Sequence, residues 1–127
     1  MIAFQKMWLY VGGRRYVYVN VDDCWMAKER DADGAVVPDP KRFPSGFNAL
    51  TDYAHKRGML FGFYTAMGTG TCSSYPALNC TGRPGDDCAQ ARRDVAQYVA
   101  YGIDSLKIDG CEGMVPDHFN VSYPLVS

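Results

Sequence analysis

The chain alternates short apolar runs typical of buried strands with stretches whose apolar residues recur at helical spacing. The strand-like runs cover residues 16–21, 59–64 and 105–109 and are rich in β-branched and aromatic side chains. The apolar positions of the two expected helices are Phe47, Leu50, Tyr53 and Ala54, closed by Gly58, and Ala91, Val95, Tyr98 and Val99, closed by Gly102. Asp86 or Asp87 is expected to cap the second helix. The resulting β-α-β-α-β order predicts a parallel sheet built through right-handed crossovers.

Polar side chains end or follow each expected strand, and they favour one parallel architecture over another. These side chains are Asp22, Asp23, Tyr64, Lys107 and Asp109. In a (β/α) barrel the carboxyl ends of the strands form the active site. A doubly wound nucleotide-binding sheet requires a glycine-rich phosphate loop after a strand, and Gly68-Thr69-Gly70 lacks the GxGxxG spacing. Because a complete barrel takes roughly 250 residues, we expect an α/β fold that is a partial (β/α)8 TIM barrel with about three of eight units.

Composition excludes several classes of partner. The 127 residues include 13 Lys plus Arg and 14 Asp plus Glu, and 47% are hydrophobic. A net charge of −1 lacks the basic excess that nucleic acid or an anionic membrane surface requires, so neither is expected as a partner. No apolar run reaches the roughly 18 residues of a membrane span, and residues 1–11 do not have the pattern of a signal peptide.

The five cysteines indicate disulfides rather than a zinc site, because none lies in a CxxC pair. Cys80 and Cys88 flank a Gly/Pro-containing loop whose flexibility could let them meet. An oxidising compartment would follow. Two glycosylation sequons, Asn79-Cys80-Thr81 and Asn120-Val121-Ser122, point the same way. Five is odd, so one thiol lacks a partner within this sequence.

The third strand carries the residue pair with the clearest chemistry. Lys107 and Asp109 are two apart on a strand, so they leave the same face, and a nearby cation keeps a carboxylate ionised. A rigidly placed carboxylate is what a glycosidase uses as its nucleophile. The carboxylates of Asp22 and Asp23 can accept hydrogen bonds from sugar hydroxyls, and Tyr64 and Trp25 would add aromatic faces. These residues therefore predict a sugar-binding site.

Other interpretations of the same residues remain open. Lys-x-Asp on a strand is more often a structural ion pair, and consecutive aspartates are often only a turn or a helix cap. A metal site built from Asp22, Asp23, Asp109 and Glu112 is chemically feasible. We expect no metal and no cofactor, since His55 and His118 do not fall at ligand-like spacing, and we expect His55 to be solvated.

Several blocks of the sequence, agreeing in order and spacing over residues 16 to 112, closely resemble the α-galactosidases of glycoside hydrolase family 27. The blocks are Tyr18-Val19-Asn20-Val21-Asp22-Asp23-Cys24-Trp25, Arg30-Asp31, Arg42-Phe43-Pro44-Ser45-Gly46, Gly62-Phe63-Tyr64, Gly68, Thr71-Cys72 and Leu106-Lys107-Ile108-Asp109-Gly110-Cys111. The resemblance implies a retaining exo-glycosidase that releases terminal α-linked galactose, or α-N-acetylgalactosamine in a sister branch. It also implies a (β/α)8 barrel followed by a β-sandwich.

The resemblance assigns roles residue by residue. Asp109 is implied as the nucleophile, Lys107 as a hydrogen-bond donor to the sugar, and Asp22 with Asp23 as the pair that binds galactose hydroxyls. Tyr64 is implied to line the same pocket. A disulfide between Cys72 and Cys111 is implied to border the sugar site, whereas the Cys80–Cys88 stretch looks longer than is usual for the family. Cys24 matches a cysteine that pairs with an upstream partner, which would explain the odd count.

The sequence departs from the family pattern in two places, and these departures determine the expected domain bounds and the expected activity of the chain alone. Residues 1–15 do not resemble the family's first strand and helix, so we expect a non-matching segment over 1–15 and a partial catalytic domain over 16–127. No residue matches the acid/base aspartate, so the chain is expected to be an N-terminal fragment that is inactive alone. The expected partners are an α-galactoside substrate and, for the full-length protein, a second copy in a homodimer. Secretion or a lysosomal or vacuolar location is expected.

Three alternatives to an α-galactosidase stay open at this point. The first is α-N-acetylgalactosaminidase, because the positions that contact the 2-substituent in the family lie beyond this sequence. The second is a non-catalytic sugar-binding remnant, in which the aspartate pair keeps its use and Asp109 does not. The third is a divalent-metal hydrolase on a similar barrel.

Overall fold

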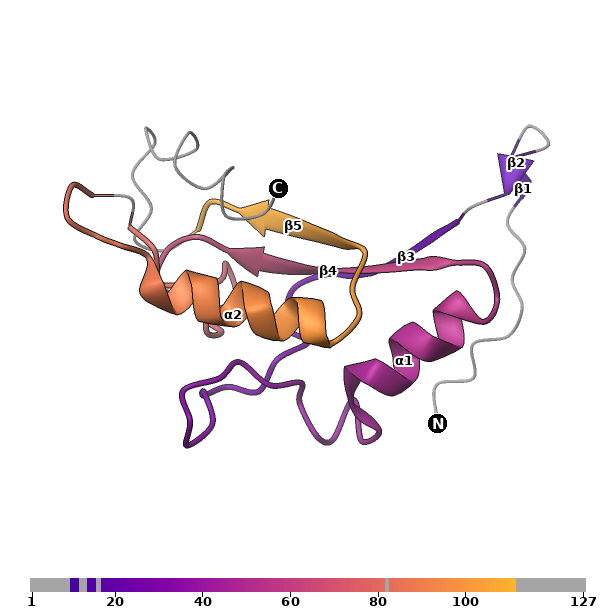
Figure 1. Ribbon diagram of the computed structural model, residues 1–127, viewed down its shortest axis with the longest axis horizontal. Helices are drawn as coiled ribbons and strands as arrows, with labels where there is room; N and C mark the ends of the chain where they lie inside the picture. Colours follow the sequence, from indigo (N-terminus) through magenta and orange to yellow (C-terminus); the bar gives the residue numbers. More distant parts are fainter. Residues whose placement is uncertain (1–9, 12–13, 16, 82, 112–127) are drawn as a thin grey trace.

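The computed structural model describes residues 10–11, 14–15, 17–81 and 83–111 (Figure 1). Its elements are β1 (Tyr10–Val11), β2 (Arg14–Arg15), β3 (Tyr18–Val21), α1 (Gly46–His55), β4 (Leu60–Ala66), α2 (Ala89–Ala100) and β5 (Ser105–Asp109). Strands β1 and β2 form a small antiparallel pair by themselves. Strands β3, β4 and β5 form the main sheet in that order. In the part of the chain that the structure describes, no helix is long and apolar enough to cross a bilayer.

The main sheet is parallel throughout, as the alternating pattern predicts. Asn20 on β3 lies opposite Gly62 on β4, and Gly62 in turn lies opposite Ser105 on β5. Strand β4 extends past the expected end at residue 64 because Thr65 and Ala66 still pair with β5. Parallel strands put their carboxyl ends at one edge, so the loops that follow β3, β4 and β5 meet there.

Both helices pack on the same face of this sheet and bury an aromatic core (Figure 1). Trp25 packs against Phe63 of β4 and Phe47 of α1 with tilted rings, whose centroids lie 4.5 and 4.9 Å from that of the tryptophan. Tyr98 of α2 meets the Phe63 ring edge-on at 4.9 Å. Burial of one such side chain is worth about 1.5–3 kcal/mol. The contacts of the sheet with both helices therefore fix the strand ends that carry the polar residues.

Two features of α2 differ from the sequence expectation. Its N-cap is Cys88, which has a left-handed φ of 50°, rather than Asp86 or Asp87. Both carboxylates still act at the helix start, because Asp86 accepts from Cys88 N–H at 2.9 Å and Asp87 accepts from Ala89 N–H at 3.0 Å. Val99 does not face the core, since 67% of its surface is exposed.

One inward-facing position of α2 is occupied by a buried carboxylate, which the pattern of apolar residues did not predict. Asp94 of α2 is 2% exposed and binds Arg30 through two hydrogen bonds of 2.7 Å each. Arg30 also donates to the carbonyl oxygens of Gly34 at 2.8 Å and Ala77 at 2.6 Å. This arginine therefore ties α2 to the loop after β3 and to the loop after β4.

An unexpected contact lies at the C-terminal end of α1, at the opposite edge of the sheet. His55 ends α1, and its Nε2 lies 2.7 Å from Oδ2 of Asp104. The same carboxylate oxygen accepts the Phe61 N–H at 2.8 Å. His55 is exposed, as expected, and the turn before β5 also brings the Asp104 carboxylate to its ring.

Candidate active site

Asp109 ends β5 at the carboxyl edge of the sheet, and two donors hold its carboxylate. Oδ1 accepts the Gly110 N–H at 2.8 Å, and Oδ2 accepts the hydroxyl of Tyr64 at 3.3 Å. Tyr64 lies on the neighbouring strand β4, where it pairs with Lys107, two residues before Asp109. Both oxygens therefore have a fixed direction, and the carboxylate is partly open to solvent.

Tyr64 is a buried phenol that remains a hydrogen-bond donor. It is 2% exposed, and burial together with the negative charges of Asp109 and Asp23 raises its pKa to about 12. A neutral phenol donates one hydrogen bond. At neutral and acidic pH, Tyr64 therefore positions the Asp109 carboxylate without adding a charge of its own.

Lys107 forms its ion pair with Asp22 rather than with Asp109. Its Nζ lies 3.0 Å from Oδ2 of Asp22 and 5.0 Å from the centre of the Tyr64 ring. The lysine thus reaches from β5 across the β4 tyrosine to the residue that follows β3. The backbone N–H of Asp23 and then Lys107 lower the pKa of Asp22. Among the described residues, Lys107 therefore makes its direct ion pair with Asp22, and none is found between Lys107 and Asp109.

Asp23 connects two of the loops at this edge. Its Oδ1 accepts the Cys24 N–H at 2.6 Å and its Oδ2 accepts the Ser73 N–H at 3.1 Å. Ser73 belongs to the loop after β4, so the carboxylate joins that loop to the end of β3. No helix begins directly after Asp22 and Asp23, so they are not a helix cap, whereas each carboxylate accepts from the N–H of the next residue, as in a local turn.

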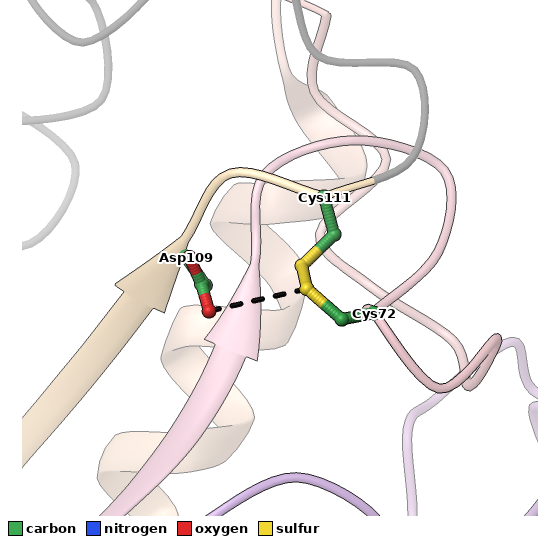
Figure 2. A group of neighbouring side chains, drawn as sticks. All are labelled: Cys72, Asp109 and Cys111. Carbon is green, nitrogen blue, oxygen red and sulfur yellow. Dashed lines mark hydrogen bonds between the residues drawn. A yellow bond between two sulfur atoms is a disulfide. The ribbon is translucent and has the colours of Figure 1, made fainter.

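A disulfide closes the site on the side of Asp109. Cys72 and Cys111 are bonded, the pairing that the family resemblance implies, and they join the loop after β4 to the residue two positions past β5 (Figure 2). The Sγ of Cys72 lies 4.0 Å from Oδ2 of Asp109, and the Sγ of Cys111 lies 3.3 Å from the Tyr64 hydroxyl. Because the two sulfurs are bonded to each other, neither offers a thiolate to a metal ion.

The inner face of the sheet, away from both helices, forms an open cavity of about 440 Å³. Its lining includes Asp22, Tyr64 and Lys107, and it continues down the strands to Asn20 and Ser105. Ser105 Oγ lies 3.4 Å from the Asn20 side-chain oxygen. Sequence reasoning missed Asn20 and Ser105, although each lies two residues before a predicted site residue on the same strand face.

Gly62 allows this close approach. A Cβ at Gly62 would collide with Ser105 Oγ and with the Asn20 side-chain oxygen, and would lie 3.0 Å from the Ser105 carbonyl oxygen. Glycine is the residue whose missing side chain permits such contacts. The polar floor of the cavity thus depends on a residue that contributes no chemistry.

Trp25 does not present an aromatic face to this cavity, contrary to the sequence expectation. It is 1% exposed in the core, and its Nε1 donates to the Tyr64 carbonyl oxygen at 2.7 Å. A tryptophan with a buried N–H needs such a partner. Its role is to hold the backbone of the strand that carries Tyr64. Glu112 and His118, named for the metal alternative, lie outside the described residues.

The structure therefore brings the candidate residues Asp22, Asp23, Tyr64, Cys72, Lys107 and Asp109 to one edge of the sheet. Sequence and fold comparisons identify relatives of this arrangement. The family model described as alpha galactosidase A matches residues 5–127, so the match extends into the 1–15 segment that we set apart.

Curated relatives share sequence over most of the chain. The chain is 45% identical over 96 residues to an alpha-N-acetylgalactosaminidase of Gallus gallus, a match over 76% of the chain and 22% of that relative. It is 37% identical over 99 residues to an alpha-galactosidase of Cyamopsis tetragonoloba, covering 78% of the chain and 22% of the relative. The chain thus spans about a fifth of the length of these relatives.

Solved structures of related proteins share the fold of this chain over the matched region. An alpha-galactosidase of Saccharomyces cerevisiae, solved with raffinose, superimposes with a TM-score of 0.68 at 31% identity. That match covers 78% of the chain and 20% of the yeast protein. Alpha-galactosidase I of Mortierella vinacea superimposes with a TM-score of 0.67 at 33% identity, over 78% of the chain and 23% of that structure. With a family match over nearly its whole length, this chain belongs to the alpha galactosidase A family.

Proposed function

We propose that the full-length protein is a retaining exo-glycosidase that hydrolyses terminal α-D-galactosyl residues. Residues 16–127 would supply about three units of its (β/α)8 catalytic barrel. The observation that carries the proposal is the Asp109 carboxylate, held by Tyr64 and Gly110 beside the Asp22–Lys107 pair at the carboxyl edge of parallel strands. That edge is where barrel enzymes place their chemistry.

In the proposed first step, Asp109 attacks the anomeric carbon of the galactoside. The bond from that carbon to the leaving-group oxygen breaks as a covalent galactosyl ester forms on Asp109, and an acid protonates the departing oxygen. Water then hydrolyses the ester with the same acid acting as base. In a retaining enzyme the two carboxyl groups lie about 5–5.5 Å apart. We assign the second carboxyl to sequence outside this chain, so the chain alone is proposed to be inactive.

Substrate binding is assigned to the groups around Asp109. Lys107 can donate hydrogen bonds to sugar oxygens, and the carboxylates of Asp22 and Asp23 can accept from hydroxyls. Their existing contacts with one another support this assignment, because groups held in place lose less entropy when they bind a sugar. Tyr64 and the Cys72–Cys111 disulfide would form the wall nearest the nucleophile.

Asp109→Asn in the full-length protein tests the nucleophile. We expect hydrolysis of an aryl α-galactoside to fall below detection while galactose binding, measured by calorimetry, persists. Asp33→Asn is the matched control, because Asp33 is an exposed carboxylate in the loop after β3. Unchanged turnover in Asp109→Asn would overturn the assignment, whereas a wild-type protein that binds galactose without turnover would support a sugar-binding remnant. Loss of activity with EDTA would instead support a metal hydrolase.

A second candidate activity is α-N-acetylgalactosamine release. It is favoured by the higher identity to the Gallus gallus relative, 45%, than to the Cyamopsis tetragonoloba relative, 37%. Parallel assays of the full-length protein on aryl α-galactoside and aryl α-N-acetylgalactosaminide decide between the two by the ratio of kcat/KM values.

The location of the protein in the cell and its oligomeric state are proposed on separate grounds. Two disulfides in the described residues fit an oxidising compartment. We therefore assign the protein to secretion or to a lysosome or vacuole. A homodimer of the full-length protein is assigned on the family resemblance, and light scattering of that protein tests it.

A further inference from the structure

The sequon Asn79-Cys80-Thr81 lies in the long loop after β4, and its asparagine is exposed. Asn79 has a left-handed φ of 52°, and its N–H donates to the Gly68 carbonyl oxygen at 2.9 Å. Its position is therefore anchored through the backbone. Asn79 borders an open groove of about 480 Å³ that also includes Lys28, Thr69 and Tyr75. None of the candidate active-site residues lines this groove, so a large group attached there would leave the sugar site open.

The other two residues of the sequon are engaged by partners within the folded loop. Cys80 is 1% exposed and forms a disulfide with Cys88, which is 4% exposed. Thr81 donates its hydroxyl to Oδ2 of Asp86 at 2.7 Å, and its N–H donates to the same oxygen at 2.8 Å. The hydroxyl that defines a glycosylation sequon is thus occupied by Asp86 once the Cys80–Cys88 loop has formed.

We propose that Asn79 is an N-glycosylation site and that closure of the Cys80–Cys88 disulfide ends the time in which it can be modified. The proposal goes beyond the glycosidase function and depends on the secretory route rather than on catalysis. The donor is a polyprenyl diphosphate-linked oligosaccharide. The bond from the sugar's anomeric carbon to the phosphate oxygen breaks, a bond from that carbon to Asn79 Nδ2 forms, and Nδ2 loses one proton. Polyprenyl diphosphate leaves.

The competing step is an oxidation. Cys80 and Cys88 lose two electrons and two protons, and a disulfide-carrying oxidoreductase is reduced to its dithiol. Cys88 is 8 residues after Cys80 in sequence, so it is synthesised about one second later at roughly 5–20 residues per second. Disulfide formation takes seconds to hours. The sequon is therefore accessible for a limited time, and partial occupancy is the expected outcome.

The test measures glycan occupancy in a eukaryotic secretory host. The chain, extended to its full-length reading frame and directed into the endoplasmic reticulum, carries Asn120→Gln so that the second sequon of this chain is silent. Any further sequon of the extension is resolved by peptide mapping of residue 79. Occupancy is the fraction of the peptide containing Asn79 that an amidase converts to aspartate. Asn79→Gln defines zero.

Two variants release the sequon in different ways. Cys88→Ser removes the disulfide and leaves all three sequon residues unchanged, so occupancy is expected to rise from partial to nearly complete. Asp86→Ala frees the Thr81 hydroxyl while both cysteines remain, and a smaller rise is expected. Cys72→Ser is the matched control, because it breaks a disulfide of which neither cysteine belongs to the sequon or to the Cys80–Cys88 pair. Occupancy in Cys72→Ser is expected to equal that of the parent.

Each result decides the proposal. No conversion at residue 79 in the parent or in Cys88→Ser would overturn Asn79 as a glycosylation site. Equal occupancy in the parent and in Cys88→Ser would overturn the competition, as would an equal rise in Cys72→Ser. Partial occupancy that rises only in Cys88→Ser and Asp86→Ala supports both parts. Because the readout is glycan occupancy, a failure of the proposed glycosidase function would leave it unaffected.

Discussion

The hydroxyl of Tyr64 lies 3.3 Å from Oδ2 of Asp109, across the boundary between strands β4 and β5. This contact joins Tyr64, which is 2% exposed, to the partly exposed carboxylate at the end of β5. The tyrosine is itself held by Trp25, which donates to its carbonyl oxygen. A chain of contacts thus runs from the aromatic core to the proposed nucleophile, and substitutions along it have distinct expected effects.

Tyr64→Phe removes the hydroxyl donor and keeps the ring. A hydrogen bond to a charged group is worth about 1.5–3 kcal/mol. We expect kcat/KM of the full-length protein on an aryl α-galactoside to fall about tenfold to hundredfold, because each 1.4 kcal/mol is a factor of ten. Steady-state kinetics measure this. A fall of the same size in Tyr53→Phe, an exposed ring on α1, would show that the effect is not specific to the site.

The titration of Tyr64 gives a second prediction. Its pKa in the folded protein is about 12, whereas an unperturbed tyrosine has a pKa of about 10. The stability that comes from this group is fully present below pH 10 and is lost as the pH rises from about 10 to about 12. Between these values, wild type is expected to lose more unfolding free energy than Tyr64→Phe. Urea unfolding of both proteins at several pH values measures the difference, and equal losses would contradict the prediction.

Arg30→Met leaves the buried Asp94 carboxylate without a counter-charge, and among the described residues only the side-chain amide of Gln90 still donates to it, at 2.9 Å. Breaking a buried pair by removing one partner costs about 3–5 kcal/mol. We expect the free energy of unfolding to fall by that amount, measured by denaturant titration of the full-length protein. The double variant Arg30→Met/Asp94→Leu should recover a large part of the loss, because no unpaired charge remains. A single variant as stable as the wild type would show that Asp94 finds another partner.

Gly62→Ala tests the packing beneath the cavity. The new Cβ has no room beside Ser105 and Asn20, and overpacking of this kind costs about 1–3 kcal/mol. We expect a loss of that size in the free energy of unfolding, measured by thermal or urea denaturation. Ser105→Ala in the same protein should restore part of the stability, since it removes the side-chain oxygen. Full stability in Gly62→Ala alone would contradict this account.

The sequence predicted the three strands of the main sheet, the two helices and their order, because local patterns decide them. The β-branched runs and the helical spacing of Phe47 and its neighbours appear in the structure as a parallel sheet with α1 in the expected place. The carboxyl ends of the strands were also predictable, since a parallel topology brings them to one edge. That Tyr64, Lys107 and Asp109 lie close together was therefore predictable from their places at the ends of strands.

The partners of those residues were decided by the tertiary structure. Two-residue periodicity puts Lys107 and Asp109 on one face, but only the order β3-β4-β5 brings Lys107 across Tyr64 to Asp22. Trp25 reads as a site aromatic in sequence and becomes core because the loop after β3 folds under the sheet. Asp94 is not one of the apolar positions expected for the second helix, and it is buried because Arg30 reaches it from a segment 64 residues away. Composition and periodicity determine what lies on a face, whereas long-range packing determines which charge meets which.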